Sequence, residues 1–209
     1  MKQRDTMNGS NGSGHWRWLA LAGALAVGGA AHAGDPRIAQ DSRTAFKSFA
    51  QPLIGSWDCN LRTWEDRFHE RMVETPQKRR FEWVLKGTFL QENIHAVLRN
   101  GETAHVGMNM ISVDPETTHI LLSGFGAATP DRRMTLDGEL APDLRHLTGR
   151  VQLQPATEDG DSPRRLEWQW LDDNRTSART YARAPNGREF LNTELICKRP
   201  EGSENKSNW

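Results

Sequence analysis

Cysteines, long hydrophobic runs and an excess of either charge are all scarce in this sequence of 209 residues. Its 27 Lys and Arg residues are matched by 27 Asp and Glu residues, so the basic excess that binding to nucleic-acid phosphates requires is absent. After residue 33, no segment approaches the roughly 20 apolar residues of a membrane-spanning helix. We therefore expect no nucleic-acid partner, and no transmembrane segment in that part of the chain.

Motifs of common enzymes and metal sites are missing as well. The sequence has no Gly-x-Ser-x-Gly motif, no phosphate-binding loop and no cysteine beside a plausible base. No group of His, Cys and carboxylate residues has the spacing of metal ligands. We expect neither a bound metal nor a cofactor.

The first 33 residues have the layout of a cleavable signal peptide. Basic residues precede an apolar run, Leu19–Ala30, and Ala31-His32-Ala33 forms a small-x-small cleavage site. The apolar run covers about 18 Å as a helix, much less than a hydrocarbon core of about 30 Å. The sequence predicts export to the periplasm or the extracellular medium, with cleavage before Gly34.

The rest of the chain divides into a flexible start, one domain and a polar tail. Residues 34–43 and 201–209 are polar, and we expect loose structure there. Residues 44–200 are long enough for one domain with a sizeable core. Within it, Thr44–Leu53 has apolar residues at helical spacing, which predicts a short helix.

Strands follow this helix as far as the tail. Dipeptides that favour turns, such as Lys86-Gly87, Asn100-Gly101 and Asp173-Asn174, separate short alternating segments. The predicted strands are 57–64, 80–85, 88–98, 103–113, 118–125, 133–139, 146–153, 165–171, 177–183 and 189–198. Such a series indicates an antiparallel meander, and a meander of eight to ten strands loses its exposed edges by closing into a barrel. The predicted fold is an all-β, up-and-down barrel with a short N-terminal helix.

Hairpin register assigns the early strands to two faces. A two-residue turn at Lys86-Gly87 pairs Trp83 with Leu90, and one at Asn100-Gly101 pairs Ala96 with His105. The predicted inner set is Phe81, Trp83, Leu85, Leu90, Glu92, Ile94, Ala96 and Leu98, with His105 and Asn109 on the next strand. Met108 and Met110 fall outside, and His95 faces away from His105. A slip of one residue would invert this assignment.

The late strands are assigned in the same way. A two-residue turn at Asp173-Asn174 places Ser177, Arg179 and Tyr181 on the face that carries Leu166, Trp168 and Trp170. A three-residue loop at Pro185-Asn186-Gly187, with a bulged glycine, suits a type I turn. This loop places Leu191, Thr193, Leu195 and Cys197 inside and leaves Glu194 outside.

Four sequence blocks together resemble a bacterial lipocalin-like family catalogued as domain of unknown function 1579. They are Leu53–Trp57, Phe81–Gln91, Ser112–Thr117 and Tyr181–Phe190, and the match covers roughly Pro52–Arg199. The two cysteines and the polar stretch Glu92–His95 depart from the family. The resemblance implies a calycin-type barrel with Trp57 at its closed end. It implies no reaction, since the family has no settled activity.

The predicted ligand site combines charged, polar and aromatic residues. An inward Arg179 with Tyr181 offers a planar fork and a hydroxyl to a carboxylate, similar to the Arg-x-Tyr of fatty-acid-binding barrels. The alternatives are an interior Arg179 neutralised by Glu92, or an outward one. Tryptophans either line a pocket or fill the barrel. The full predicted set is Trp83, Glu92, His105, Asn109, Trp168, Trp170, Arg179 and Tyr181.

Three functions remain open at this point. The first is binding of a small, apolar or amphipathic molecule, which carries a carboxylate in one version. The second is an enzyme of isomerase or hydrolase type that uses Glu92 and His105 as acid and base. The third is a non-catalytic envelope adaptor with Met108, Met110 and His119 on its outer surface.

The two cysteines suit a disulfide, because export to an oxidising compartment permits one. Family resemblance places Trp57 inside, and Cys59 shares its face, while Cys197 shares the face of Leu195. In an even-stranded meander that closes, the first and last strands are antiparallel neighbours. Opposed residues there have Cα atoms about 4.5–5.5 Å apart, within the range of a disulfide. We predict a Cys59–Cys197 bond at this seam; the alternative is two free, buried thiols.

Overall fold

The computed structural model describes residues 36–64, 70–127, 129–154, 163–184 and 186–202. The predicted signal peptide, residues 1–33, lies outside the described residues. So do Pro185 of the predicted three-residue loop and most of the predicted tail. Among the described residues, no helix has both the length and the apolar character needed to cross a membrane.

A single helix precedes the sheet in the described part of the chain. Helix α1 (Pro36–Ala50) continues into the 3-10 turn η1 (Gln51–Leu53). It starts well before Thr44, so residues expected to be loose are helical, and proline suits the first position of a helix. The apolar side carries Phe46, Phe49 and Leu53, all buried.

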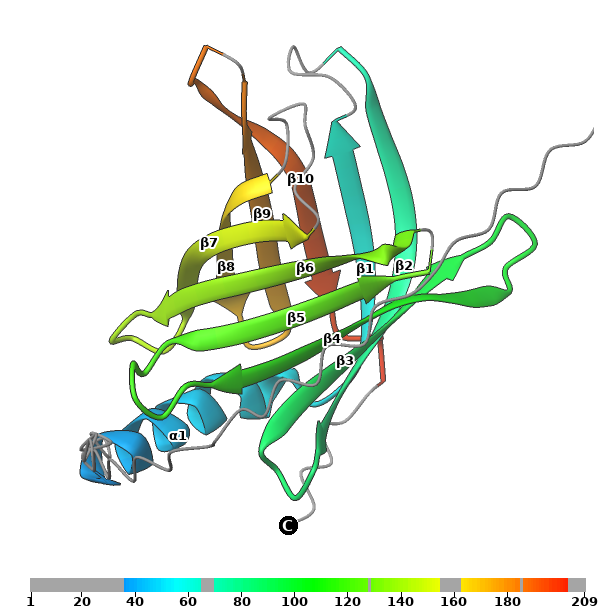
Figure 1. The fold of residues 1–209 in the computed structure, drawn as a ribbon. Helices are drawn as coiled ribbons and strands as arrows, with labels where there is room; N and C mark the ends of the chain where they lie inside the picture. Colours follow the sequence, from blue (N-terminus) through cyan, green and yellow to red (C-terminus); the bar gives the residue numbers. More distant parts are fainter. Residues whose placement is uncertain (1–35, 65–69, 128, 155–162, 185, 203–209) are drawn as a thin grey trace, which may run out of the picture. The chain divides into compact units, whose positions relative to one another are not determined.

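Ten strands form one closed antiparallel barrel, as predicted. They are β1 (Gly55–Trp64), β2 (Met72–Val84), β3 (Phe89–Val97), β4 (Thr103–Val113), β5 (Ile120–Gly126), β6 (Thr129–Leu140), β7 (His146–Gln154), β8 (Pro163–Asp172), β9 (Arg175–Arg183) and β10 (Glu189–Lys198). Each strand pairs with the next along the chain, and β1 pairs with β10 to close the sheet (Figure 1). This is the topology of a lipocalin-like barrel.

Helix α1 covers one end of the barrel (Figure 1). Phe46 and Phe49 meet Trp83 and Trp168 edge to face, with ring centroids 5.6 Å and 5.7 Å apart. Trp57 is buried at this end, and its Nε1 donates to the carbonyl of Leu53 over 2.6 Å. The guanidinium of Arg199 lies 4.1 Å from the centre of the Trp57 ring and donates to the carbonyls of Pro52 and Ile54. This end is therefore closed by side chains.

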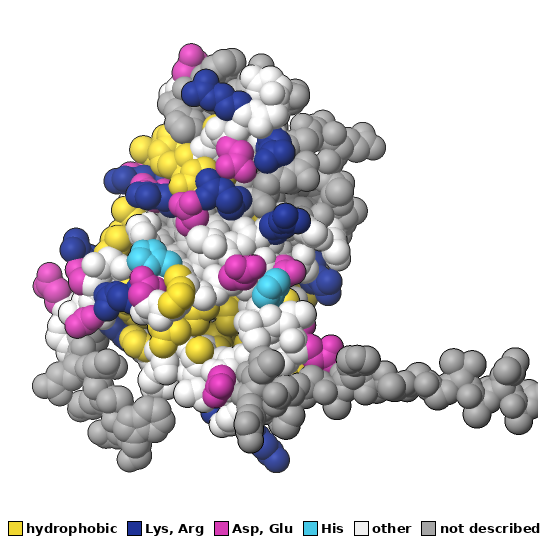
Figure 2. All heavy atoms as spheres, turned by 90° about the vertical axis from the view of Figure 1, so that its left-hand side faces the viewer, with side chains coloured by type: hydrophobic (Ala, Val, Ile, Leu, Met, Phe, Trp, Pro, Cys, Tyr) yellow, Lys and Arg dark blue, Asp and Glu magenta, His cyan; other side chains and the backbone are white. Residues whose placement is uncertain are grey.

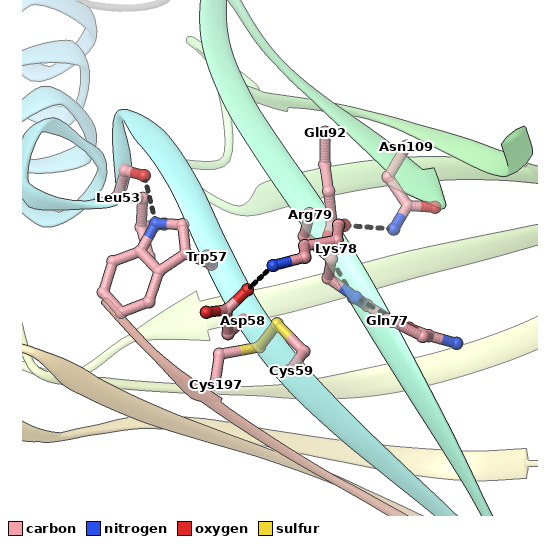
Figure 3. Close-up of a disulfide and its surroundings, with 10 residues drawn as sticks. All are labelled: Leu53, Trp57, Asp58, Cys59, Gln77, Lys78, Arg79, Glu92, Asn109 and Cys197. Atoms are coloured by element: carbon pink, nitrogen blue, oxygen red, sulfur yellow. Dashed lines mark hydrogen bonds and ion pairs between the residues drawn. A yellow bond between two sulfur atoms is a disulfide. The ribbon is translucent and has the colours of Figure 1, made fainter. Parts of the chain in front are cut away.

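The seam between β1 and β10 carries the predicted disulfide. Cys59 and Cys197 are directly opposed in the register of the two strands and are bonded (Figure 3). The predicted strand order and the predicted pairing are both confirmed.

Strand β9 is inverted relative to the prediction. The pairing of β8 with β9 shifts by one residue between Trp170 and Asp172, and that of β10 with β9 shifts between Leu191 and Thr193. Trp168 therefore pairs with Ala178 rather than with Arg179. Each bulge adds one residue to one strand of a pair. Past the bulge the register is shifted by one residue, so the residues of the neighbouring strand lie on the opposite face from the one predicted. The predicted inward orientation of Arg179, Tyr181 and Ser177 is wrong.

A third bulge changes the hairpin of β3 and β4. The register shifts between Ile94 and His95, so His95 pairs with His105 and their ring centroids lie 5.0 Å apart. The prediction that these histidines face opposite sides is wrong. His105 is exposed rather than directed into the barrel. Leu85 and Leu98 are also exposed, because each lies in or beside a turn.

The outer surface mixes the two charges. Figure 2 shows Lys, Arg, Asp and Glu side chains interspersed on one face of the molecule, with hydrophobic side chains between them. No single sign dominates this face.

Candidate ligand-binding cavity

The barrel encloses a cavity of about 420 Å³. Strands from all around the barrel contribute to its wall, and most of the lining is apolar. Its apolar residues include Phe81, Leu122, Met134, Leu166, Trp168 and Leu195. Trp168 is held between Phe49 of the helix and Phe81, whose ring centroid lies 6.1 Å away. Packed aromatic rings therefore line the cavity at the end nearest the helix.

A group of four polar side chains interrupts this apolar wall on β2, β3 and β4. We call Gln77, Arg79, Glu92 and Asn109 the inner polar cluster (Figure 3). They share the inner face because Arg79 pairs with Ile94, and Glu92 pairs with both Phe81 and Asn109. Arg79, Glu92 and Asn109 line the cavity, while Gln77 is buried and is not part of the lining.

Glu92 is the centre of the inner polar cluster. Its Oε1 accepts from Arg79 Nη1 over 2.6 Å, and its Oε2 accepts from Asn109 Nδ2 over 2.5 Å. Arg79 also donates through Nε and Nη2 to Gln77 Oε1, over 3.0 Å and 2.8 Å. Only 3% of the Glu92 side chain and 12% of the Arg79 side chain are exposed. A buried ion pair needs further hydrogen bonds to its donors and acceptors, and Gln77 and Asn109 supply part of them here.

Hydroxyl groups supply a second, weaker polar feature on β9 and β10. Thr176, Thr180 and Thr193 line the cavity there. The hydroxyls of Thr180 and Thr193 lie 2.5 Å apart across the two strands. The hydroxyls of Thr180 and Thr193 therefore bond each other, and none of the three groups carries a charge.

The structure brings only part of the predicted set to the cavity. Glu92, Asn109 and Trp168 line it. Trp83 and Trp170 instead lie at the closed end. There Trp83 Nε1 donates to Gln51 Oε1, and the ring centroids of Trp170 and Trp57 are 5.9 Å apart. These two tryptophans were placed on the correct face but at the wrong height along the barrel.

Two residues of the inner polar cluster, Gln77 and Arg79, are absent from the predicted ligand site. Arg79 and Gln77 continue the inner alternation of Trp83 and Phe81 towards the start of β2. The predicted strand began at Arg80, whereas β2 begins at Met72. Continuing the alternation by two further inward positions would have found both residues.

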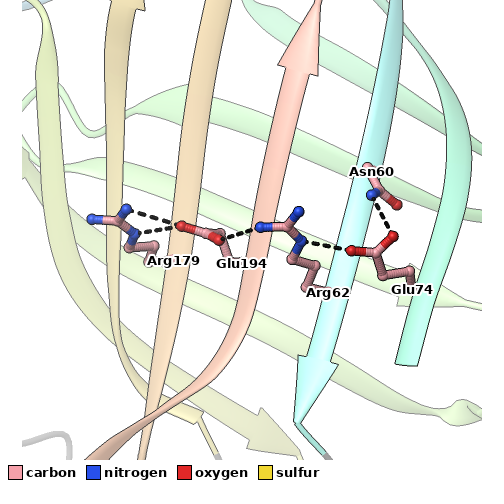
Figure 4. Close-up of polar contacts among 5 residues, drawn as sticks. All are labelled: Asn60, Arg62, Glu74, Arg179 and Glu194. Carbon is pink, nitrogen blue, oxygen red and sulfur yellow. Dashed lines mark hydrogen bonds and ion pairs between the residues drawn. The ribbon is translucent and has the colours of Figure 1, made fainter. Parts of the chain in front are cut away.

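Arg179 and Tyr181 contact other side chains on the outer surface. Arg179 donates to Glu194 over 2.9 Å, Glu194 accepts from Arg62 over 3.5 Å, and Arg62 donates to Glu74 over 2.8 Å. We call Arg179, Glu194, Arg62 and Glu74 the outer ion-pair row; it crosses β9, β10, β1 and β2 (Figure 4). Glu194 was correctly predicted to lie outside.

The surroundings of the outer residues also shift their protonation equilibria. Tyr181 donates to Glu167 over 2.9 Å, and its partial burial, followed by this carboxylate, raises the pKa of the phenol. Hydrogen bonds from Asn60 and Arg62 lower the pKa of Glu74.

The histidines that the structure describes do not form a metal centre with other described residues. Among the described residues, no three His, Cys, Asp or Glu side chains are placed to hold a metal ion. His119 lies on the outer surface, where its Nδ1 is 2.6 Å from Asp137.

No protein-family model matches the chain, and a search of curated proteins finds no match. Among solved structures, the crystal structure of Rv2717c from M. tuberculosis is similar, with 15% identity and a TM-score of 0.54 over 75% of this chain and 97% of that one. A protein of unknown function from the DUF3598 family of Nostoc punctiforme has 10% identity and a TM-score of 0.42, over 72% and 48% of the two chains. Lobster apocrustacyanin A1 has 8% identity and a TM-score of 0.35, over 78% and 68%.

The strand topology and the first of these likenesses define the fold: a closed, antiparallel, up-and-down barrel of lipocalin-like type with an internal cavity. Identity this low supports the fold alone. The resemblance to domain of unknown function 1579 remains a prediction.

Proposed function

We propose that the protein binds a small, largely apolar molecule inside its barrel. The observation that carries this proposal is the cavity of about 420 Å³ with a mostly apolar wall above the closed end. Ligand pockets of proteins typically enclose about 300–1,000 Å³ and combine apolar walls with a few placed polar groups. An apolar molecule that enters such a space leaves water, and this transfer drives binding.

The enzyme alternative has less support from the geometry. A general base needs a carboxylate or imidazole that is free to take a proton from the substrate. Both oxygens of Glu92 already accept hydrogen bonds from Arg79 and Asn109, and His105, its predicted partner, is exposed. The adaptor alternative keeps Met108, Met110 and His119 on the outer face, but no observation favours a partner for them.

The carboxylate-bearing version of the ligand also loses its original basis. It depended on an inward Arg179, and that residue pairs with Glu194 outside. The arginine at the cavity is Arg79, which Glu92 already neutralises.

Binding of N-phenylnaphthylamine, an uncharged fluorescent dye, tests the proposal. Ala178 lines the cavity and pairs with Trp168, so Ala178→Phe places a phenyl ring in the space the dye needs. We expect the variant to weaken dye binding by at least about tenfold, equivalent to about 1.4 kcal/mol. The matched control, Arg179→Phe, places the same ring on the outer face and should leave dye binding unchanged. Equal binding to wild type and both variants would contradict the proposal.

We further propose that the protein is exported and works outside the cytoplasm. The Cys59–Cys197 disulfide supports this, because such bonds persist in oxidising compartments. N-terminal sequencing of the protein from a periplasmic or culture-medium fraction should give a chain that starts at Gly34. A chain that starts at Met1 in the membrane fraction would contradict export.

A further inference from the structure

The inner polar cluster leaves hydrogen-bonding groups of Arg79 for a ligand. The guanidinium donates through Nε and Nη2 to Gln77 and through Nη1 to Glu92. Each terminal nitrogen of arginine carries a second N–H. Within the described part of the chain, these second N–H groups have no protein acceptor. Arg79 lines the cavity, so they are available as donors there.

Asn109 leaves an acceptor beside them. The ion-paired carboxylate of Glu92 only accepts hydrogen bonds, so the amide nitrogen of Asn109 must face it and the amide oxygen must point away (Figure 3). That oxygen lies where a side chain of Gly124 would begin: a Cβ built on Gly124 would be 2.4 Å from Asn109 Oδ1. Gly124 and Asn109 both line the cavity, and the missing side chain of Gly124 leaves room for this oxygen at the cavity wall.

The donor and the acceptor belong to two residues that bind the same carboxylate. Arg79 and Asn109 bind the two oxygens of the same Glu92 carboxylate, so their remaining groups are within reach of one small functional group. The Arg79–Glu92 pair has no net charge. A ligand carboxylate at Arg79 would add a second anion beside Glu92, and a ligand ammonium at Asn109 would add a second cation beside Arg79. Like charges this close are strongly unfavourable where little water screens them.

We infer that the ligand carries one uncharged polar group that both accepts and donates a hydrogen bond, of the carboxamide or alcohol class, and that this group binds Arg79 and Asn109. A carboxamide oxygen accepts from Arg79 while its N–H donates to Asn109 Oδ1. The apolar part of the ligand then extends along Trp168. This inference rests on the proposed binding function and adds the chemistry of the ligand's head group.

A matched series of ten-carbon probes tests the inference: decanamide, decanol, decanoate and decylammonium, each used to displace N-phenylnaphthylamine at neutral pH. We expect decanamide and decanol to compete at least about tenfold better than the two ions, since each ion leaves an uncompensated charge in the cavity. A methyl ketone of the same length accepts but does not donate, so it should compete less well than decanamide.

Two variants sharpen this test. Gly124→Ala forces the Asn109 oxygen aside and should remove the advantage of decanamide over the ketone. Thr135→Val, which changes a hydroxyl on the outer face, should preserve that advantage. If decanoate competes as well as decanamide in the wild-type protein, the head-group inference is wrong while cavity binding stands. If neither the dye nor any probe binds, the proposed function itself fails.

Discussion

Two arginine–glutamate pairs in this barrel have the same chemistry and opposite surroundings. Arg79 and Glu92 are 2.6 Å apart inside the barrel, with 12% and 3% of their side chains exposed. Arg179 and Glu194 are 2.9 Å apart outside, with 41% and 12% exposed. Gln77 and Asn109 satisfy further groups of the inner pair, whereas water can reach Arg179 in the outer one. We therefore expect breaking the buried inner pair to cost much more unfolding free energy than breaking the solvent-screened outer pair.

The largest effect is expected when the inner pair is broken. Arg79→Met leaves the Glu92 carboxylate buried without its cation, which typically costs about 3–5 kcal/mol of unfolding free energy. Urea unfolding followed by tryptophan fluorescence measures this loss. The double variant Arg79→Met/Glu92→Met replaces both charges and should recover at least half of it. A loss below about 1 kcal/mol in the single variant would mean that the pair is solvated like a surface pair.

The disulfide joins β1 and β10 on the inner face of the barrel, whereas the outer ion-pair row joins the same two strands on the outer face. Cys59 and Cys197 lie 138 residues apart in the sequence, so the bond restricts a long loop in the unfolded chain. We expect the Cys59→Ala/Cys197→Ala variant to lose about 2–4 kcal/mol of unfolding free energy. Reduction of the wild-type protein should give a similar loss. Two alkylated cysteines in the unreduced protein would show that the bond is absent.

Breaking the outer pair should cost much less. Arg179→Met, the same substitution as in the inner pair, is expected to lower the unfolding free energy by about 0.2–1 kcal/mol. The loss should shrink at about 1 M salt, where charges are screened within about 3 Å. A double-mutant cycle with Glu194→Gln isolates the pair. A coupling energy as large as that of the inner pair would remove the contrast between the two sites.

The smallest effect is a pH response of the outer row. Hydrogen bonds from Asn60 and Arg62 hold the pKa of Glu74 below its ordinary value. The folded protein therefore binds this proton less readily than the unfolded chain. The resulting stabilisation is present above a pH of about 4.3, the ordinary glutamate value, and is lost as the pH falls through the lowered pKa. NMR titration should place Glu74 below the ordinary value, and Glu74→Gln should flatten this part of the acid unfolding profile. A Glu74 that titrates at or above the ordinary value would contradict this account.

The fold was predictable from the sequence because its determinants are local. Alternating apolar residues and turn dipeptides define the strands, and Cys59 and Cys197 locate the seam. Bulges are not determined locally. The one-residue shifts at Leu171 and Asn192 accommodate the twist of the closed barrel, and no residue pattern in the sequence indicates them. Arg179 was therefore assigned to the wrong face.

The candidate site was only partly predictable for a related reason. The hairpin register correctly placed Glu92 and Asn109 on the inner face. Face alone does not give height along the barrel axis, so Trp83 and Trp170 were assigned to the cavity although they pack at the closed end. Arg79 was missed because the basic run before Phe81 was left out of the predicted strand.

The central claim is that the cavity, with its neutral inner pair, holds the ligand. A crystal structure of the protein with decanamide tests it most directly. The account predicts the alkyl chain against Trp168 inside the barrel, with the amide within hydrogen-bond distance of Arg79 and Asn109. An empty cavity in decanamide-saturated crystals, or decanamide bound only on the outer face, would contradict it.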